Sequence, residues 1–131
     1  MLAVKPQLMG EVVTGLLPLR KAKPLVLSIA AGKTIAGFEN VLGADAAIIR
    51  AMPNTPAAIG RGITGMVGNA RVSPAQMALA EAVLASTGEV LRVKNEEAID
   101  FVTAVSGSGP ACGFYLAECL AAAVVPLGVP G

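Results

Sequence analysis

Apolar strand patterns and helix patterns alternate along the first two thirds of this chain. Strand patterns occupy residues 2–4, 25–30, 46–52, 63–67 and 90–93, with helix patterns between them at residues 7–17, 34–42 and 73–87. Alternation of this kind predicts helices that cross over between strands, and such crossovers join parallel neighbours. Continuous apolar runs also suit strands that are buried on both faces. We therefore expect an α/β fold with a mostly parallel sheet.

The helix that begins near Ser73 has the clearest start signal. In Ser73-Pro74-Ala75-Gln76, the serine can cap the helix, the proline suits the first turn, and the glutamine can complete a capping box. We expect Gly88 to stop this helix. The spacing of Leu79, Val83 and Leu84 predicts that they share one face of it.

After Lys94 the pattern changes to helix only, and we place a domain boundary there, between residues 1–94 and 95–131. Asn95 is expected to cap the first of these helices. The apolar residues that follow are spaced for packing on one face: Ile99, Val102 and Val105.

Small residues surround a proline in Ser106-Gly107-Ser108-Gly109-Pro110-Ala111, a segment that predicts close backbone approach. Proline can begin a helix but is unfavourable inside one, so we expect this segment to separate two helices. The second helix is apolar around most of its circumference and needs burial on several sides. It must pack on the α/β layer, on a segment outside this chain or on a partner chain. Pro126 should end or kink it.

Charge and hydropathy restrict the class of partner. With 10 basic and 9 acidic residues, the chain has no charge excess for binding nucleic acid or an anionic membrane. Its 54% hydrophobic residues indicate a subunit interface. Residues 111–127 contain Glu118 and fall short of the roughly 20 apolar residues that span a bilayer, so we expect a buried helix and no membrane span. Without a visible secretory signal, the expected location is cytoplasmic.

Histidine is absent from the chain, which removes the commonest general acid or base and the commonest metal ligand. Cys112 and Cys119 lie too far apart along a helix for a disulfide, and we expect them to be buried free thiols. No metal site is therefore expected, and no catalytic residue is assigned. The segment Gly60-Arg61-Gly62-Ile63-Thr64-Gly65 matches G-x-G-x-x-G but is predicted to be extended, so we reject it as a phosphate cradle.

Three segments follow predicted strands, at the sheet edge where open α/β sheets bind ligands. Two of them, Ala3-Val4-Lys5-Pro6 and Ile29-Ala30-Ala31-Gly32, have small side chains that would let a flat ring approach, although they could equally serve tight turns. In Met52-Pro53-Asn54-Thr55-Pro56, two prolines can hold Asn54 and Thr55 rigidly. A turn in which Asn54 bonds nearby backbone explains the third segment as well.

Together with Arg50-Ala51-Met52-Pro53-Asn54-Thr55-Pro56 and the glycine segment at 106–111, these motifs make nearly the whole chain resemble the middle of pyrroline-5-carboxylate reductases. The resemblance implies the latter part of a Rossmann-like dinucleotide-binding domain, followed by the first helices of an all-α dimerisation domain. It also implies reduction of 1-pyrroline-5-carboxylate to L-proline, with NADPH or NADH as hydride donor, in a homo-oligomer. The choice between NADPH and NADH stays open.

The resemblance also assigns residues to the two ligands. The cofactor-binding candidates are Ala3, Val4, Lys5, Pro6, Ile29, Ala30, Ala31, Gly32, Asn54 and Thr55. The substrate-binding candidates are Glu96, Ser106, Gly107, Ser108 and Gly109. From the sequence alone, Glu96 is better explained as complementing the dipole of its own helix. Ile29 and Cys112 stand where the family often has cysteine and usually has tyrosine, respectively.

In this family a glycine-rich cofactor cradle precedes the matched segment, and a substrate-binding helical segment follows it. We therefore expect neither site to be complete in this chain. A second hypothesis is a non-catalytic truncated relative that acts as an oligomerisation module. A third is the unstable product of a broken reading frame, whose uncovered sheet edge and apolar helix would cause aggregation.

Overall fold

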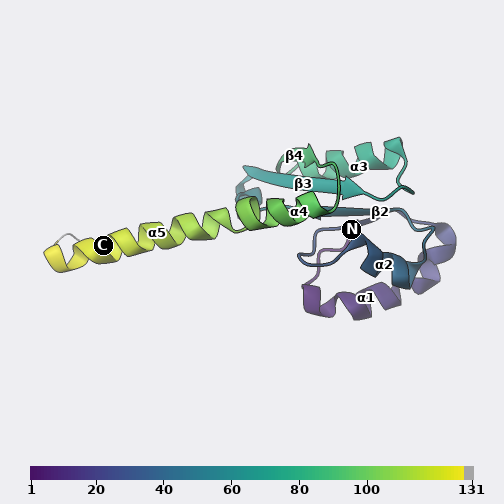
Figure 1. Cartoon of the computed structure of the whole chain (residues 1–131), viewed down its shortest axis with the longest axis horizontal. Coiled ribbons are helices and arrows are strands. Elements are labelled where there is room, and N and C mark those ends of the chain that lie inside the picture. The colour runs from purple at the N-terminus through teal and green to yellow at the C-terminus, as the bar shows by residue number, and fades with distance from the viewer. Residues whose placement is uncertain (129–131) are drawn as a thin grey trace.

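The computed structural model describes residues 1–128, which form a small α/β layer with one long helix projecting from it (Figure 1). Four strands make a single sheet in the order β1-β2-β3-β4. Their bounds are Val26–Ser28 for β1, Ile48–Met52 for β2, Gly62–Gly68 for β3 and Gly88–Arg92 for β4. The strand expected at residues 2–4 is reduced to one parallel bridge between Leu2 and Ser28.

The sheet is mostly parallel, as expected, but its direction reverses in the middle. The pairs β1/β2 and β3/β4 are parallel, whereas β2 and β3 are antiparallel, with Met52 opposite Gly65. The link between β2 and β3, residues 53–61, holds only the 3-10 turn Thr55–Ile59. A parallel pair needs a crossover of about a dozen residues or more, so this short link returns the chain in the opposite direction.

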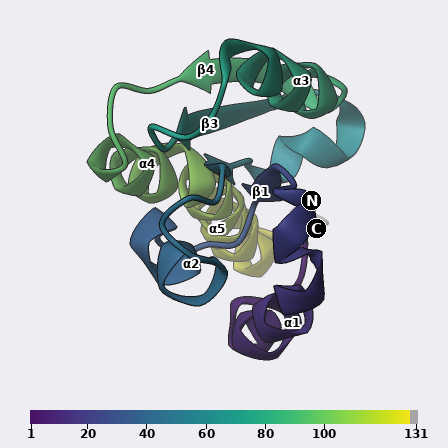
Figure 2. The ribbon, with the colours of Figure 1, turned by 90° about the vertical axis from the view of Figure 1, so that its right-hand side faces the viewer.

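Helices cover both faces of the sheet (Figure 2). Helices α1 (Met9–Gly15) and α2 (Ile35–Leu42) pack on one face, and α3 (Pro74–Ala85) packs on the other. Successive side chains of a strand point to opposite faces, so Ile48 belongs to the first core and Ile49 to the second. The expected helices at residues 34–42 and 73–87 are confirmed. The helix expected at residues 7–17 is shorter, because only α1 is α-helical and 3-10 turns flank it on both sides.

The start of α3 is confirmed, but of the three residues expected to share a face only Leu84 is buried. Ser73 and Gln76 form the complete capping box, each side chain bonding the other residue's backbone N–H. Ala80 and Leu84 are buried against the sheet, whereas Leu79 is 60% exposed and Val83 45% exposed. Since α3 is apolar around much of its surface, periodicity alone did not select the side that faces the sheet. The helix ends at Ala85, and Gly88 instead begins β4.

One continuous helical segment follows β4, which corrects the expected separation of two helices at the glycine segment. Helix α4 (Glu97–Val102) continues through the π-helical turn Thr103–Gly107 into α5 (Gly109–Val124). The N–H of Ser108 donates to the carbonyl of Thr103, five residues earlier. This wider turn accommodates Pro110 without breaking the helix. The α-helix ends before Pro126, as predicted.

Helix α5 has no buried residue in this chain, so the α/β layer, one of the three expected partners, does not cover it. Cys112 and Cys119 are free but exposed, so their predicted burial is wrong. Glu97–Leu127 is a helix of 31 residues with a mean hydropathy of 1.6 in its most apolar window, long and apolar enough to cross a membrane. The argument from the shorter stretch 111–127 therefore does not exclude a span. Nothing within the described residues 1–128 buries α5. The domain boundary after Lys94 stays a prediction.

Candidate functional site

The predicted cofactor segments lie at one edge of the sheet. Strands β1 and β2 are parallel, so their carboxyl ends lead to 29–32 and 53–55 at the same edge. Leu2 pairs in parallel with Ser28, which brings 3–6 there as well. This edge thus holds all the predicted cofactor-binding residues: Ala3, Val4, Lys5, Pro6, Ile29, Ala30, Ala31, Gly32, Asn54 and Thr55.

The turn after β1 is tight, and its side chains are small. Ala30 is buried, and its N–H donates to the Oγ of the fully buried Ser28 at 3.3 Å. Gly32 has a φ of 69°, in the left-handed region that favours glycine, and no atom lies within 4 Å of the place a Cβ would occupy. A hollow of about 220 Å³ opens beside Gly32, between α1 and α2. A planar group can therefore approach the backbone of this turn.

Asn54 connects the loop after β2 to the glycine segment of the long helix. Its Nδ2 donates to the Oγ of Ser106 at 3.1 Å, and its Oδ1 accepts the N–H of Ile63 at 2.9 Å. A turn in which Asn54 bonds nearby backbone explains the bond to Ile63 but not the bond to Ser106. Thr55 is exposed and begins the following turn. Asn54 therefore joins a predicted cofactor loop to a predicted substrate segment.

Close backbone approach occurs where the long helix crosses the sheet. A Cβ on Gly107 would lie 3.2 Å from the methyl group of Met52, and one on Gly65 would lie 3.0 Å from a methyl group of Val102. By contrast, Gly109 has open space around it, and the Oγ of Ser108 donates to the carbonyl of Thr103. The glycine segment thus has a packed side, toward β2, and an open side.

Glu96 is held by groups from two other elements. Its Oε1 accepts the N–H of Ile35 at 2.8 Å and a hydrogen bond from Nη1 of Arg50 at 3.0 Å. Glu96 therefore lies at the N-terminus of α2. It is also the residue directly before α4, so the explanation through the dipole of its own helix stays open. Oδ1 of the predicted cap Asn95 accepts the N–H of Ala98, although Glu96 is the residue that directly precedes the helix.

Sequence reasoning missed Arg50 as a residue of this site. Its side chain is 3% exposed within β2, and its second terminal nitrogen donates to Oδ1 of Asp100 at 2.8 Å. The available signal was a single charged residue inside the apolar run 46–52. Buried charges require partners, and two carboxylates four residues apart on one helix face could supply them.

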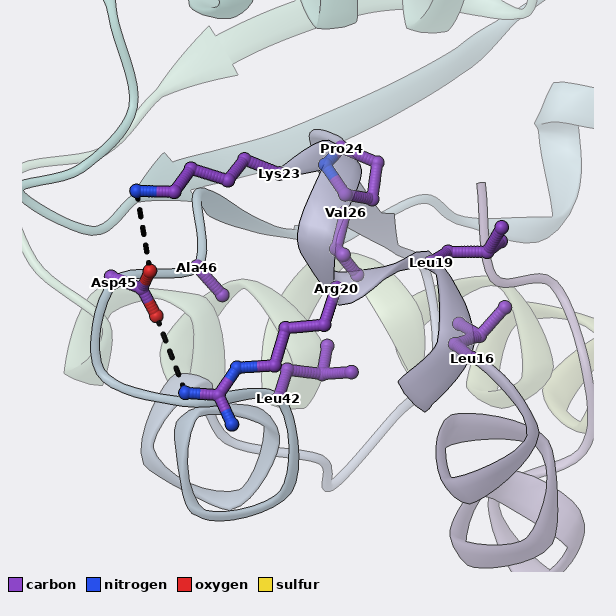
Figure 3. Close-up of a pocket in the computed structure, with 9 residues that line it drawn as sticks. All are labelled: Leu16, Leu19, Arg20, Lys23, Pro24, Val26, Leu42, Asp45 and Ala46. Atoms are coloured by element: carbon purple, nitrogen blue, oxygen red, sulfur yellow. Dashed lines mark ion pairs between the residues drawn. The ribbon is translucent and has the colours of Figure 1, made fainter.

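A second pocket lies away from this edge, at the amino end of β1 (Figure 3). It has a volume of about 40 Å³ and an apolar lining that includes Leu16, Leu19, Val26 and Leu42. At its rim, Asp45 pairs with Lys23 at 3.4 Å and with Arg20 at 3.6 Å, as the dashed lines show. A hydrogen bond from the backbone, followed by one from Lys23, lowers the pKa of Asp45. The cations are thus already paired, and we do not assign a ligand here.

One further motif has a structural explanation. Gly60 ends the turn Thr55–Ile59 and Gly62 begins β3, so the G-x-G-x-x-G pattern does not open a helix, and its predicted extended conformation from Gly62 onward is confirmed. Within residues 1–128, no group of three or more His, Cys, Asp or Glu side chains is arranged to hold a metal ion.

Comparison with known proteins gives the family. The fold is the latter part of a Rossmann-like dinucleotide-binding domain joined to the beginning of a helical dimerisation domain, as residues 96–131 match the family model "Pyrroline-5-carboxylate reductase dimerisation". The chain is therefore a relative of the pyrroline-5-carboxylate reductases, and the resemblance expected from its motifs is confirmed.

Individual relatives support this assignment over nearly the whole chain. The pyrroline-5-carboxylate reductase of Pseudomonas aeruginosa is 44% identical over 128 residues, which are 98% of this chain and 47% of that protein. That of Escherichia coli is 41% identical over 128 residues, again 98% of this chain and 47% of that protein. The chain spans about half the length of the relatives it matches.

Solved structures agree. The pyrroline carboxylate reductase of Plasmodium falciparum, crystallised with NADP bound, has a TM-score of 0.88 at 32% identity. The match covers 98% of this chain and 51% of the Plasmodium falciparum chain. The pyrroline-5-carboxylate reductase of Coxiella burnetii has a TM-score of 0.86 at 40% identity, and the match covers 98% of this chain and 48% of the Coxiella burnetii chain.

Proposed function

We propose that this chain forms part of an NAD(P)H-dependent reductase that converts 1-pyrroline-5-carboxylate to L-proline. The observation that carries the proposal is the hydrogen bond between Asn54 and Ser106, which joins the candidate cofactor edge to the candidate substrate segment. Two ligands bound on either side of this bond would lie next to each other. Hydride transfer between two rings depends above all on such positioning.

The residues present fit a nicotinamide cofactor at the carboxyl edge of the sheet. Ala31 and Gly32 are small and exposed, and the place of a Cβ on Gly32 is open. Bound there, the cofactor would supply the hydride for the C=N carbon of the substrate. The backbone after β1 would support the ring, together with Ala3, Val4, Lys5, Pro6, Ile29, Ala30, Asn54 and Thr55. The NADP in the Plasmodium falciparum structure favours NADPH over NADH.

The substrate would lie against the open side of the glycine segment. We assign it to Ser106, Gly107, Ser108 and Gly109, because Ser108 and Gly109 are exposed while Asn54 holds Ser106 in place. The other predicted residue, Glu96, lies ten residues before Ser106 on one continuous helix, roughly 15 Å away, so it would not contact the same small ring.

The exposed helix α5 would bind a second copy of this chain. The family model for dimerisation matches residues 96–131, which include the whole of α5. Phe114, Tyr115, Leu116 and Leu120 are each between 61% and 73% exposed, which is a large apolar surface for a protein in water. In the proposed soluble, cytoplasmic reductase, a second copy of the chain would bury this surface, and no membrane would be needed.

The reductase is tested by following NADPH and NADH consumption with 1-pyrroline-5-carboxylate and by identifying proline as the product. The protein assayed should carry any flanking segments that its reading frame encodes. Consumption of either cofactor with formation of proline supports the proposal. Failure to bind either cofactor contradicts it.

The exposed surface of α5 also supports a second function, that of a non-catalytic oligomerisation module. Light scattering and cofactor titration separate the two. A stable dimer that binds no nicotinamide cofactor favours the module, whereas a dimer that binds cofactor and forms proline favours the reductase. A monodisperse monomer contradicts the proposed role of α5 in both.

A further inference from the structure

The long helix, Glu97–Leu127, contacts the α/β layer through its first turns. Ile99 of α4 is fully buried at this contact, whereas α5 has no buried residue and projects away from the layer (Figure 1). A helix of 31 residues is about 45 Å long, so a tilt of about 10° at its base would move its far end by about 8 Å. The contacts at the base therefore decide where the whole of α5 lies.

The apolar contacts at the base do not by themselves select one tilt. A Cβ on Gly65 would lie 3.0 Å from a methyl group of Val102, and one on Gly107 would lie 3.2 Å from the methyl group of Met52. In each pair the glycine has no side chain that could interdigitate with its neighbour and fix a crossing angle. Apolar burial is also non-directional. These contacts bring the helix and the sheet close together without determining the angle between them.

Arg50 adds a contact that has a direction. Its side chain is 3% exposed in β2, and its two terminal nitrogens donate to Glu96 at 3.0 Å and to Asp100 at 2.8 Å. The two carboxylates lie four residues apart, so the planar guanidinium bridges two points along the helix axis. Charge-assisted hydrogen bonds of this kind are geometrically specific. By comparison, Asn54 donates to a single point, Ser106, about which a helix can still pivot.

This charged cluster should add little net stability. Removing a guanidinium from water is costly unless its hydrogen bonds are replaced. Glu96 is 30% exposed and Asp100 is 69% exposed, so water screens much of the attraction that offsets this cost. The cluster instead discriminates between arrangements, because another tilt would leave the buried Arg50 without one or both partners. Oε1 of Glu96 also accepts the N–H of Ile35 at 2.8 Å, which extends the contact to α2.

We propose that Arg50 sets the direction of the long helix: with Glu96 and Asp100 it forms a two-point clamp that selects one tilt of the helix on the sheet. The clamp contributes to the choice of arrangement more than to the free energy of folding. It needs no bound ligand and acts in the free chain. A consequence that rests on the proposed function is that α5 meets a second copy in one orientation.

The test measures the orientation of the helix relative to the sheet by NMR residual dipolar couplings. It uses the Leu120→Glu background, so that no second copy holds α5 in place. With the clamp intact, the amides of the sheet and of residues 97–124 should fit one alignment tensor, with a ratio of alignment magnitudes of about 1. In Arg50→Met the ratio should fall below about 0.8, because the helix then samples several tilts. An unchanged ratio overturns the proposal.

Two further variants show whether the fork of the arginine is what matters. Arg50→Lys should give a ratio between those of the parent and Arg50→Met, since a single ammonium does not reproduce the planar double contact. Arg92→Met is the control, because Arg92 of β4 pairs with Glu81 of α3, away from the long helix. It should match the parent. A ratio that falls equally in Arg92→Met refutes a specific role for Arg50.

Stability separates the clamp from an ordinary stabilising contact. In the neutral variant Arg50→Met/Glu96→Gln/Asp100→Asn, the melting temperature should stay within about 5 °C of the parent while the ratio falls as in Arg50→Met. This variant also carries the comparison if Arg50→Met alone does not fold. A neutral variant that no longer folds, or that keeps the ratio of the parent, contradicts the proposal. A monomeric wild type in light scattering refutes the proposed interface at α5 instead, and the couplings still judge the clamp.

Discussion

Asn54 and Ser106 are 52 residues apart in the sequence, and their side chains share a hydrogen bond of 3.1 Å. The bond joins the loop after β2 to the π-helical turn of the long helix. Arg50 makes a second connection from the same strand to Glu96 and Asp100. The long helix is thus attached to the sheet at two places, one on each side of Val102, which packs against Gly65.

The first prediction concerns this attachment. Asn54→Ala should lower the free energy of unfolding by about 1–3 kcal/mol, because it removes the bond to Ser106 and leaves the N–H of Ile63 without its acceptor. Urea denaturation measures the change. Asn40→Ala, at an exposed position of α2, is the matched control and should not destabilise the protein. Equal stability of Asn54→Ala and the wild type contradicts the attachment.

Gly88 offers a second test, at the junction of β3 and β4. Its φ is 140°, and a Cβ there would lie 2.0 Å from the backbone carbonyl oxygen of Gly62. Gly88→Ala should therefore cost about 3 kcal/mol or more, since backbone must move. Gly10→Ala, in α1 with open space around it, should be neutral or stabilise by up to about 1 kcal/mol. The melting temperature should fall strongly for Gly88→Ala and should rise or stay nearly unchanged for Gly10→Ala. Similar shifts for the two variants contradict the close approach at Gly88.

The pH dependence of stability should reflect Asp45. A backbone hydrogen bond and the side chain of Lys23 lower its pKa below the ordinary value of 3.8. A carboxyl group whose folded pKa is depressed stabilises the protein above its unfolded pKa, and that contribution is lost as the pH falls through the folded pKa. Melting temperatures measured from pH 5 downward should fall less steeply for Asp45→Asn than for the wild type. Parallel curves for the two proteins are the opposing result.

The fourth prediction concerns the apolar helix. Leu120→Glu should convert the proposed dimer to a monomer, because it places a charge on the apolar surface that a second copy would cover. Leu79→Glu on α3 is a matched control, since Leu79 is 60% exposed and Leu120 is 61% exposed. Light scattering should give a dimer for the control and a monomer for Leu120→Glu. Equal masses for the two variants contradict an interface at α5.

Local signals in the sequence predicted local structure well. The capping box of Ser73 and Gln76, the side-chain bond of Asn95 and the end of the helix before Pro126 depend on residues within one turn of each other. The motifs that carried the family resemblance are also short and continuous. They were sufficient to identify the α/β layer, the helical segment after it and the relationship to the reductases.

Only the tertiary structure determined which faces and partners these elements use. The partners of Arg50 are 46 and 50 residues away, and nothing near Arg50 in the sequence selects them. The buried side of α3 and the antiparallel turn between β2 and β3 likewise follow from packing against the sheet and from the length of a link. The sequence determines its elements through short-range sterics and hydrogen bonds, whereas the site forms because burial of the sheet brings distant charged and polar groups together, where each must find a partner.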